Sequence, residues 1–91
     1  MQRYALVETE KAVRAYHNHY GFEKPFPADF TNSVQIGEKQ AWVLRDIDGN
    51  LFLQSYGTLV SVKWADTHNY ERLGRWSVTT SHHQSEFERR F

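Results

Sequence analysis

The stretch AWVLRDIDGNLFLQSY, residues 41–56, decides the fold of this chain. Its two halves are rich in apolar, β-branched and aromatic side chains, and Asp48-Gly49-Asn50 between them is a tight-turn signal. The pattern predicts a β-hairpin with strands over residues 41–47 and 51–56. Gly57-Thr58 marks a second turn, and the alternating segment 59–65 predicts a third strand antiparallel to the second.

Helices are expected on both sides of this β-rich region. Apolar side chains recur at three- and four-residue spacing over residues 9–20, and Gly21 then supplies a helix stop. Near the other end, Thr80 or Ser81 can act as the N-cap of a helix that carries Phe87 and Phe91 four residues apart.

The expected architecture combines these elements. A short fourth strand over residues 75–79 follows the loop 66–74, and residues 23–40 are an ordered connection with isolated apolar anchors. The chain is therefore predicted to be an α+β domain of order α-β-β-β-β-α. It would be a four-stranded antiparallel meander with the N-terminal and C-terminal helices packed on one face.

Composition excludes several classes of protein. The 91 residues predict a single domain, 1–91, and 11 Lys+Arg against 11 Asp+Glu give no basic tail for nucleic acid. The chain has no Cys, so disulfides, thiolate metal sites and Cys nucleophiles are excluded. No apolar run approaches the roughly 20 residues that span a bilayer, and Glu8 interrupts any signal-like start. We expect a protein of the host-cell cytoplasm with no membrane contact.

Chemistry-bearing motifs are weak. Residues 46–50 begin like a calcium loop, but the glycine stands fourth, so the segment is interpreted as a hairpin turn. His17 and His19 lie about 200° apart on a helix and cannot share one ion. Ser81 beside His82 is a nucleophile next to a base in sequence, but a catalytic triad is defined by spatial geometry. We expect no enzyme activity, no metal and no cofactor.

Aromatic residues next to basic ones offer a second interpretation. Lys63-Trp64 and Arg75-Trp76 have the composition of a stacking platform for single-stranded nucleic acid. Acidic residues among them cancel the positive field, and two tryptophans on neighbouring strands are also typical of a small core. Single-strand binding therefore stays the alternative function.

The C-terminal half resembles a known group of domains. Residues 55–60 read Ser-Tyr-Gly-Thr-Leu-Val, and residues 77–83 read Ser-Val-Thr-Thr-Ser-His-His. Over residues 51–91 the chain resembles a family of small uncharacterised phage and mobile-element domains that have Ser-Tyr-x-Thr-x-Val and Ser-x-Thr-Thr-Ser-x-His segments. Turn formation and helix capping explain these hydroxyl residues structurally. A functional alternative is that Tyr56, Thr80, His82 and His83 meet at one end of the sheet as a polar binding surface.

The resemblance implies a phage setting, in which a small neutral protein would bind a host protein. We expect a non-enzymatic module, for example an inhibitor of CRISPR or of another defence system, acting as a monomer or as a homodimer through an edge strand. The candidate binding residues are those of the shared segments and of the two aromatic–basic pairs: Tyr56, Trp64, Arg75, Trp76, Thr80, His82 and His83.

Overall fold

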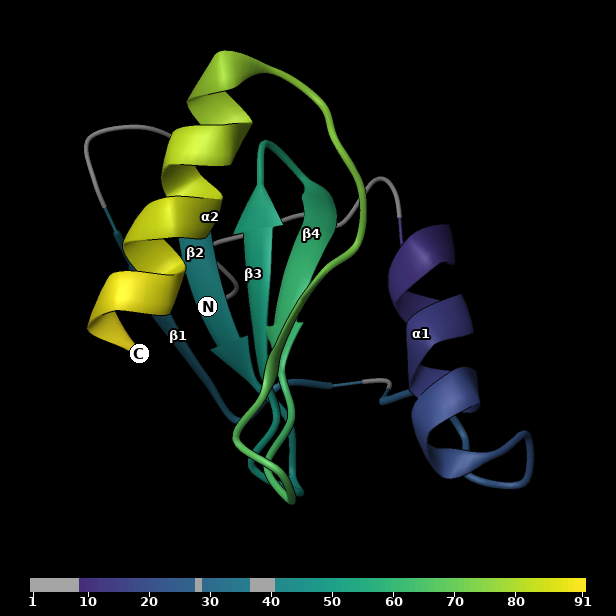
Figure 1. Ribbon diagram of the computed structural model, residues 1–91. Coiled ribbons are helices and arrows are strands. Elements are labelled where there is room, and N and C mark those ends of the chain that lie inside the picture. Colours follow the sequence, from purple (N-terminus) through teal and green to yellow (C-terminus); the bar gives the residue numbers. More distant parts are fainter. Residues whose placement is uncertain (1–8, 28, 37–40) are drawn as a thin grey trace.

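The computed structural model describes residues 9–27, 29–36 and 41–91, and these form an α+β domain with one antiparallel sheet (Figure 1). Seven elements follow one another along the chain: α1 (Glu10–Tyr20), β1 (Asn32–Gln35), β2 (Ala41–Arg45), β3 (Leu51–Ser55), β4 (Thr58–Lys63), β5 (Tyr70–Arg72) and α2 (Val78–Arg90). The strands lie in the order β1-β2-β3-β4-β5, each antiparallel to the next. The predicted meander is confirmed, but with five strands rather than four.

Two strands differ from the sequence-based prediction. β1 lies inside the expected connection 23–40, and β5 lies inside the expected loop 66–74. The expected strand 75–79 is wrong, because residues 75–77 belong to neither strand nor helix and Val78 begins α2. Both edge strands have mostly exposed side chains, so neither carries the alternating apolar pattern that identifies a strand in sequence.

The predicted N-caps of the second helix are also wrong. Ser77 caps α2, since its hydroxyl oxygen accepts a hydrogen bond of 3.1 Å from the backbone N–H of Thr80. Thr80 and Ser81 therefore lie in the first turn of the helix. Thr80 and His83 are buried and hydrogen-bond to Ser55 of β3.

The turns of the central hairpins have well-defined causes. In the β2–β3 turn, the carboxylate of Asp46 accepts hydrogen bonds from the backbone N–H groups of Asp48 and Asn50, at 3.0 and 2.8 Å. This turn confirms the hairpin interpretation of residues 46–50. In the β3–β4 turn, Tyr56 and Gly57 both adopt positive φ, 54° and 92°, the backbone of a two-residue hairpin.

The two helices lie on opposite faces of the sheet, which corrects the expectation that both pack on one face (Figure 1). Alternate residues of β2 and β3 separate the two cores: Leu44 and Phe52 pack in the α1 core, whereas Val43 and Leu53 pack with Phe87 of α2. The central strands are buried on both sides, so each face needs its own covering helix.

Candidate functional site

The two sequence segments of the resemblance meet where the β3–β4 turn faces the first turns of α2. Ser55 ends β3, and its hydroxyl oxygen lies 3.0 Å from Oγ1 of Thr80 and 2.9 Å from Nδ1 of His83. The residues are 3%, 4% and 7% exposed. We call Ser55, Thr80 and His83 the hydroxyl–histidine cluster.

The environment of the hydroxyl–histidine cluster disfavours the charged form of His83. Burial lowers the pKa of His83, and the charge of neighbouring His82 lowers this pKa further. Although a Ser–His hydrogen bond pairs a nucleophile with a base, Ser55 is too deeply buried for an external substrate to reach. The geometry instead fixes the start of α2 on the sheet.

Tyr56 lies at the solvent edge of this cluster. Its ring centroid is 5.9 Å from that of His83, and the side chain is 52% exposed. A tyrosine at positive φ is uncommon, because its Cβ crowds the backbone there. The hairpin therefore presents an aromatic ring beside α2 at some conformational cost.

A groove lies on another flank of α2, between its first turns and the segment that leads in from β5. Its volume is about 620 Å³. Its lining includes basic, aromatic, aliphatic and hydroxyl side chains: Arg72, Arg75, Trp76, Val78, Ser81 and His82. We call this feature the α2 groove.

The cations around the α2 groove have different partners. Arg72 donates hydrogen bonds to both carboxylate oxygens of Glu88, at 2.8 and 2.9 Å, which raises the pKa of Arg72 and lowers that of Glu88. Lys11 of α1 places its Nζ 5.5 Å from the centroid of the Trp76 ring. Arg75 is exposed and has no hydrogen bond or ion pair with another described residue.

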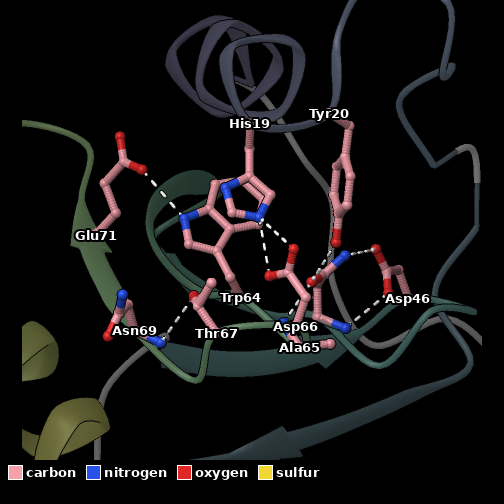
Figure 2. A network of polar contacts seen from close by, with 10 residues as sticks. His19, Tyr20, Asp46, Trp64, Ala65, Asp66, Thr67, Asn69 and Glu71 are labelled. Carbon is pink, nitrogen blue, oxygen red and sulfur yellow. Dashed lines mark hydrogen bonds and ion pairs between the residues drawn. The ribbon is translucent and has the colours of Figure 1, made fainter.

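A second polar network lies across the sheet, under α1. Figure 2 shows the ring of His19 stacked on Trp64, with centroids 4.0 Å apart and planes 2° apart. Nε2 of His19 lies 2.9 and 3.0 Å from the two carboxylate oxygens of Asp66, and this contact lowers the pKa of Asp66. The indole N–H of Trp64 donates to Glu71 at 3.2 Å. These contacts attach α1 to the segment between β4 and β5.

The candidate residues from the sequence fall into three places. Tyr56, Thr80 and His83 come together at the hydroxyl–histidine cluster, and Arg75, Trp76 and His82 line the α2 groove. Trp64 is 3% exposed on the α1 face and is not part of either.

Sequence reasoning missed several contributors. Ser55 stands first in the Ser-Tyr-x-Thr-x-Val segment, so that segment could have indicated it. Arg72 is a basic residue whose place at the groove could not be predicted, because the exposed side chains of β5 give no strand pattern. Lys11 is far from Trp76 in sequence, and no local pattern indicates that the two side chains meet.

Within residues 9–27, 29–36 and 41–91, no three His, Asp or Glu side chains gather as metal ligands. In the same ranges, no helix has the length and apolarity needed to cross a bilayer.

The fold and these sites define a small α+β domain whose sheet is covered by one helix on each face. The chain belongs to the Family of unknown function (DUF8033), whose model matches residues 27–91. The matched residues include β1 to β5 and α2, with the hydroxyl–histidine cluster and the lining of the α2 groove, and they exclude α1. No curated protein and no solved structure gives a significant match.

Proposed function

We propose that this protein is a non-enzymatic protein-binding module that contacts its partner through the α2 groove. The observation that carries the proposal is the exposed pair Arg75 and Trp76 at the groove, with Trp76 39% exposed and Arg75 unpaired among the described residues. Val78, 74% exposed, extends the apolar part of the same surface. Tryptophan and arginine are the residue types most enriched at the energetic centres of protein interfaces.

The placement of reactive groups supports a binding role rather than catalysis. The Ser–His pair with good hydrogen-bond geometry is Ser55 with His83, and both side chains are buried. Ser81 and His82, the adjacent pair in the sequence, have no hydrogen bond to each other among the contacts of the described residues. An accessible nucleophile needs a base within hydrogen-bond reach.

The biological setting belongs to the same proposal. The resemblance over residues 51–91 implies a phage or mobile element, so the first partners to test are host defence proteins, CRISPR components among them. The module would then act in the host cytoplasm as an inhibitor. This setting guides the choice of lysate and does not change the surface that we expect to bind.

Affinity capture with surface variants tests the proposal. Tagged wild-type protein is incubated with bacterial lysate, with and without nuclease, beside Arg75→Ala, Trp76→Ala and two control variants, Arg14→Ala and Phe22→Ala. The control side chains are exposed and lie outside the α2 groove. We expect a nuclease-resistant protein that the two groove variants lose and the two controls retain. Equal capture by all variants would contradict the proposed surface.

Single-stranded nucleic-acid binding is the alternative, and one observation favours it. Lys11 and Arg75 provide two cations close to the exposed ring of Trp76. This function predicts binding to mixed-sequence oligonucleotides that weakens steeply as salt is added, because phosphate contacts release counterions. Capture that disappears with nuclease would favour it over protein binding.

Self-association is a further part of the proposed partner set. β1 is one edge of the sheet, and its Val34 is 42% exposed. Pairing of two β1 strands would give a homodimer. Light scattering of the pure protein distinguishes this dimer from a monomer.

A further inference from the structure

We infer that the α2 groove takes an acidic segment of a partner protein, with a carboxylate on Arg75 and an apolar side chain against Trp76 and Val78. This inference rests on the proposed protein-binding function and names the chemistry of the ligand. Its basis is the composition of the groove, a cation that has no partner among the described residues, and an exposed apolar rim.

The charge that the groove leaves without an ion partner is positive. Arg75 lines it, Arg72 is paired with Glu88, and no Asp or Glu is among the described lining residues. Lys11 adds a second cation beside Trp76. A surface of one sign within a neutral protein selects a ligand segment of the opposite sign, and like-charged partners are rejected.

Arg75 is the cation that remains available to a ligand. The guanidinium of Arg72 already binds both oxygens of Glu88 and donates to Ser85 at 3.3 Å. Arg75 has no such partner among the described residues. A free guanidinium can take a carboxylate in a bidentate arrangement, which adds directionality to the charge attraction.

The apolar part of the groove sets the second requirement. Trp76 and Val78 are both large exposed hydrophobic residues, and they stand two positions apart beside Arg75. Water leaves both side chains when an apolar group covers them, which supplies binding energy that a carboxylate alone does not. A volume of about 620 Å³ lies within the range of well-formed ligand sites.

An acidic peptide fits these features better than a nucleic-acid strand does. A strand needs several unpaired cations along its path, whereas Arg72 is neutralised by Glu88 and the chain as a whole has equal numbers of basic and acidic residues.

Selection from a random displayed peptide library tests the inference without a known partner. The library is selected on wild-type protein and counted again on Arg75→Gln, Trp76→Ala and the control Arg14→Gln. We expect enriched peptides that combine Asp or Glu with an aromatic or aliphatic residue, and about a tenfold or greater loss of affinity in both groove variants. Arg14→Gln should bind as wild type does.

Charge reversal gives a second, independent measurement. Arg75→Glu should lose the enriched acidic peptide and gain affinity for the same peptide with Lys in place of its acidic residues. Backbone amide shifts in NMR titrations report where each peptide binds and whether the variant is folded. We expect the largest shifts within residues 72–84.

The possible results separate the two proposals. Enriched peptides without acidic residues, an absence of enriched peptides, shifts outside residues 72–84, or binding of an oligo(dT) strand in place of peptide would each overturn the acidic-segment inference. The protein-binding function would still stand if lysate capture depends on Arg75 and Trp76. If capture is indifferent to both residues, the proposed function itself fails.

Discussion

The two faces of the sheet are covered by cores that differ in their side chains. Under α1 the core is a cluster of aromatic rings. The ring centroid of Phe26 lies 5.4 Å from that of Tyr16 and 5.8 Å from that of Phe52. Under α2 the core has smaller aliphatic residues around Phe87 and also buries polar side chains, with Gln84 donating to the backbone carbonyl of Val60 at 3.0 Å. The α1 face is filled mainly by rings, and the hydrogen bonds that α1 makes there through His19 and Tyr20 are exposed or only partly buried. The hydrogen bonds that α2 makes to β3 and β4 are buried.

This difference separates stability from placement. Aromatic burial contributes a large favourable free energy but tolerates small shifts of a helix, whereas a buried hydrogen bond is satisfied only at one position. We therefore expect the hydroxyl–histidine cluster to set the position of α2 on the sheet, and with it the position of the α2 groove, although it contributes less to the free energy of unfolding than the aromatic rings do.

The largest effect is expected from removing a ring of the α1 face. Phe52→Ala should lower the free energy of unfolding by about 3–5 kcal/mol, because it leaves a cavity where Phe26 and Phe30 now pack. Urea denaturation followed by fluorescence measures this loss. Phe22→Ala is the control, since Phe22 is 84% exposed and its removal should change little. Similar losses in both variants would contradict the assignment of stability to this face.

A smaller loss is expected from the polar cluster of the α2 face. Ser55→Ala should lower the free energy of unfolding by about 1–3 kcal/mol, because Nδ1 of His83 and the hydroxyl of Thr80 lose a buried partner. Ser85→Ala on the exposed side of α2 is the matched control: it removes only a solvent-exposed hydrogen bond of 3.3 Å from Arg72 and should change the free energy of unfolding by under about 0.5 kcal/mol. If placement matters as proposed, Ser55→Ala also weakens partner capture although Ser55 touches no partner.

Acid should loosen the α2 face in a defined pH window. Burial holds the pKa of His83 below its unfolded value near 6.5, so the unfolded chain takes up a proton first. This contribution to stability is complete above about pH 6.5 and decreases as pH falls toward the folded pKa. Urea denaturation at pH values from about 7.5 to 5 measures the slope.

The control for this pH dependence is His83→Gln, which keeps a polar side chain and cannot be protonated in this range. The difference in slope between wild type and this variant isolates His83 from the other histidines. Equal slopes would show that the cluster does not titrate with folding.

Sequence predicted the centre of the fold because each element there carries its own local signal. The helical spacing before Gly21 and the Asp-Gly-Asn turn led directly to α1 and to the β2–β3 hairpin. β1 and β5 could not be found in this way, because strands with exposed side chains are defined by their pairing with β2 and β4. Their register depends on contacts with strands elsewhere in the sequence, which no local pattern encodes.

The sequence does contain a pattern that indicates a helix on each face of the sheet. Trp42-Val43-Leu44 and Leu51-Phe52-Leu53 are continuous apolar runs, which are typical of strands covered on both faces. Of the site, the shared segments led to Tyr56, Thr80 and His83, and the aromatic–basic pair led to Arg75 and Trp76. The separation of Trp64 from these residues depends on which face each strand position takes, and bulges and register set that face.

The smallest effect is expected at the β3–β4 turn, where a tyrosine occupies a position that favours asparagine. Tyr56→Asn relieves the strain of φ 54° but removes the ring that lies against His83, so the two effects oppose each other. We expect a change of under about 1 kcal/mol in the free energy of unfolding.

Gly57→Ala is the matched change at the next residue. Gly57 has a φ of 92°, which disfavours any side chain with a Cβ, so this variant should destabilise the hairpin more than Tyr56→Asn does. If Tyr56→Asn instead destabilises as strongly as Ser55→Ala, the ring is a structural part of the α2 face. If its stability is unchanged while partner capture weakens, Tyr56 is a second contact that extends the binding surface across the start of α2.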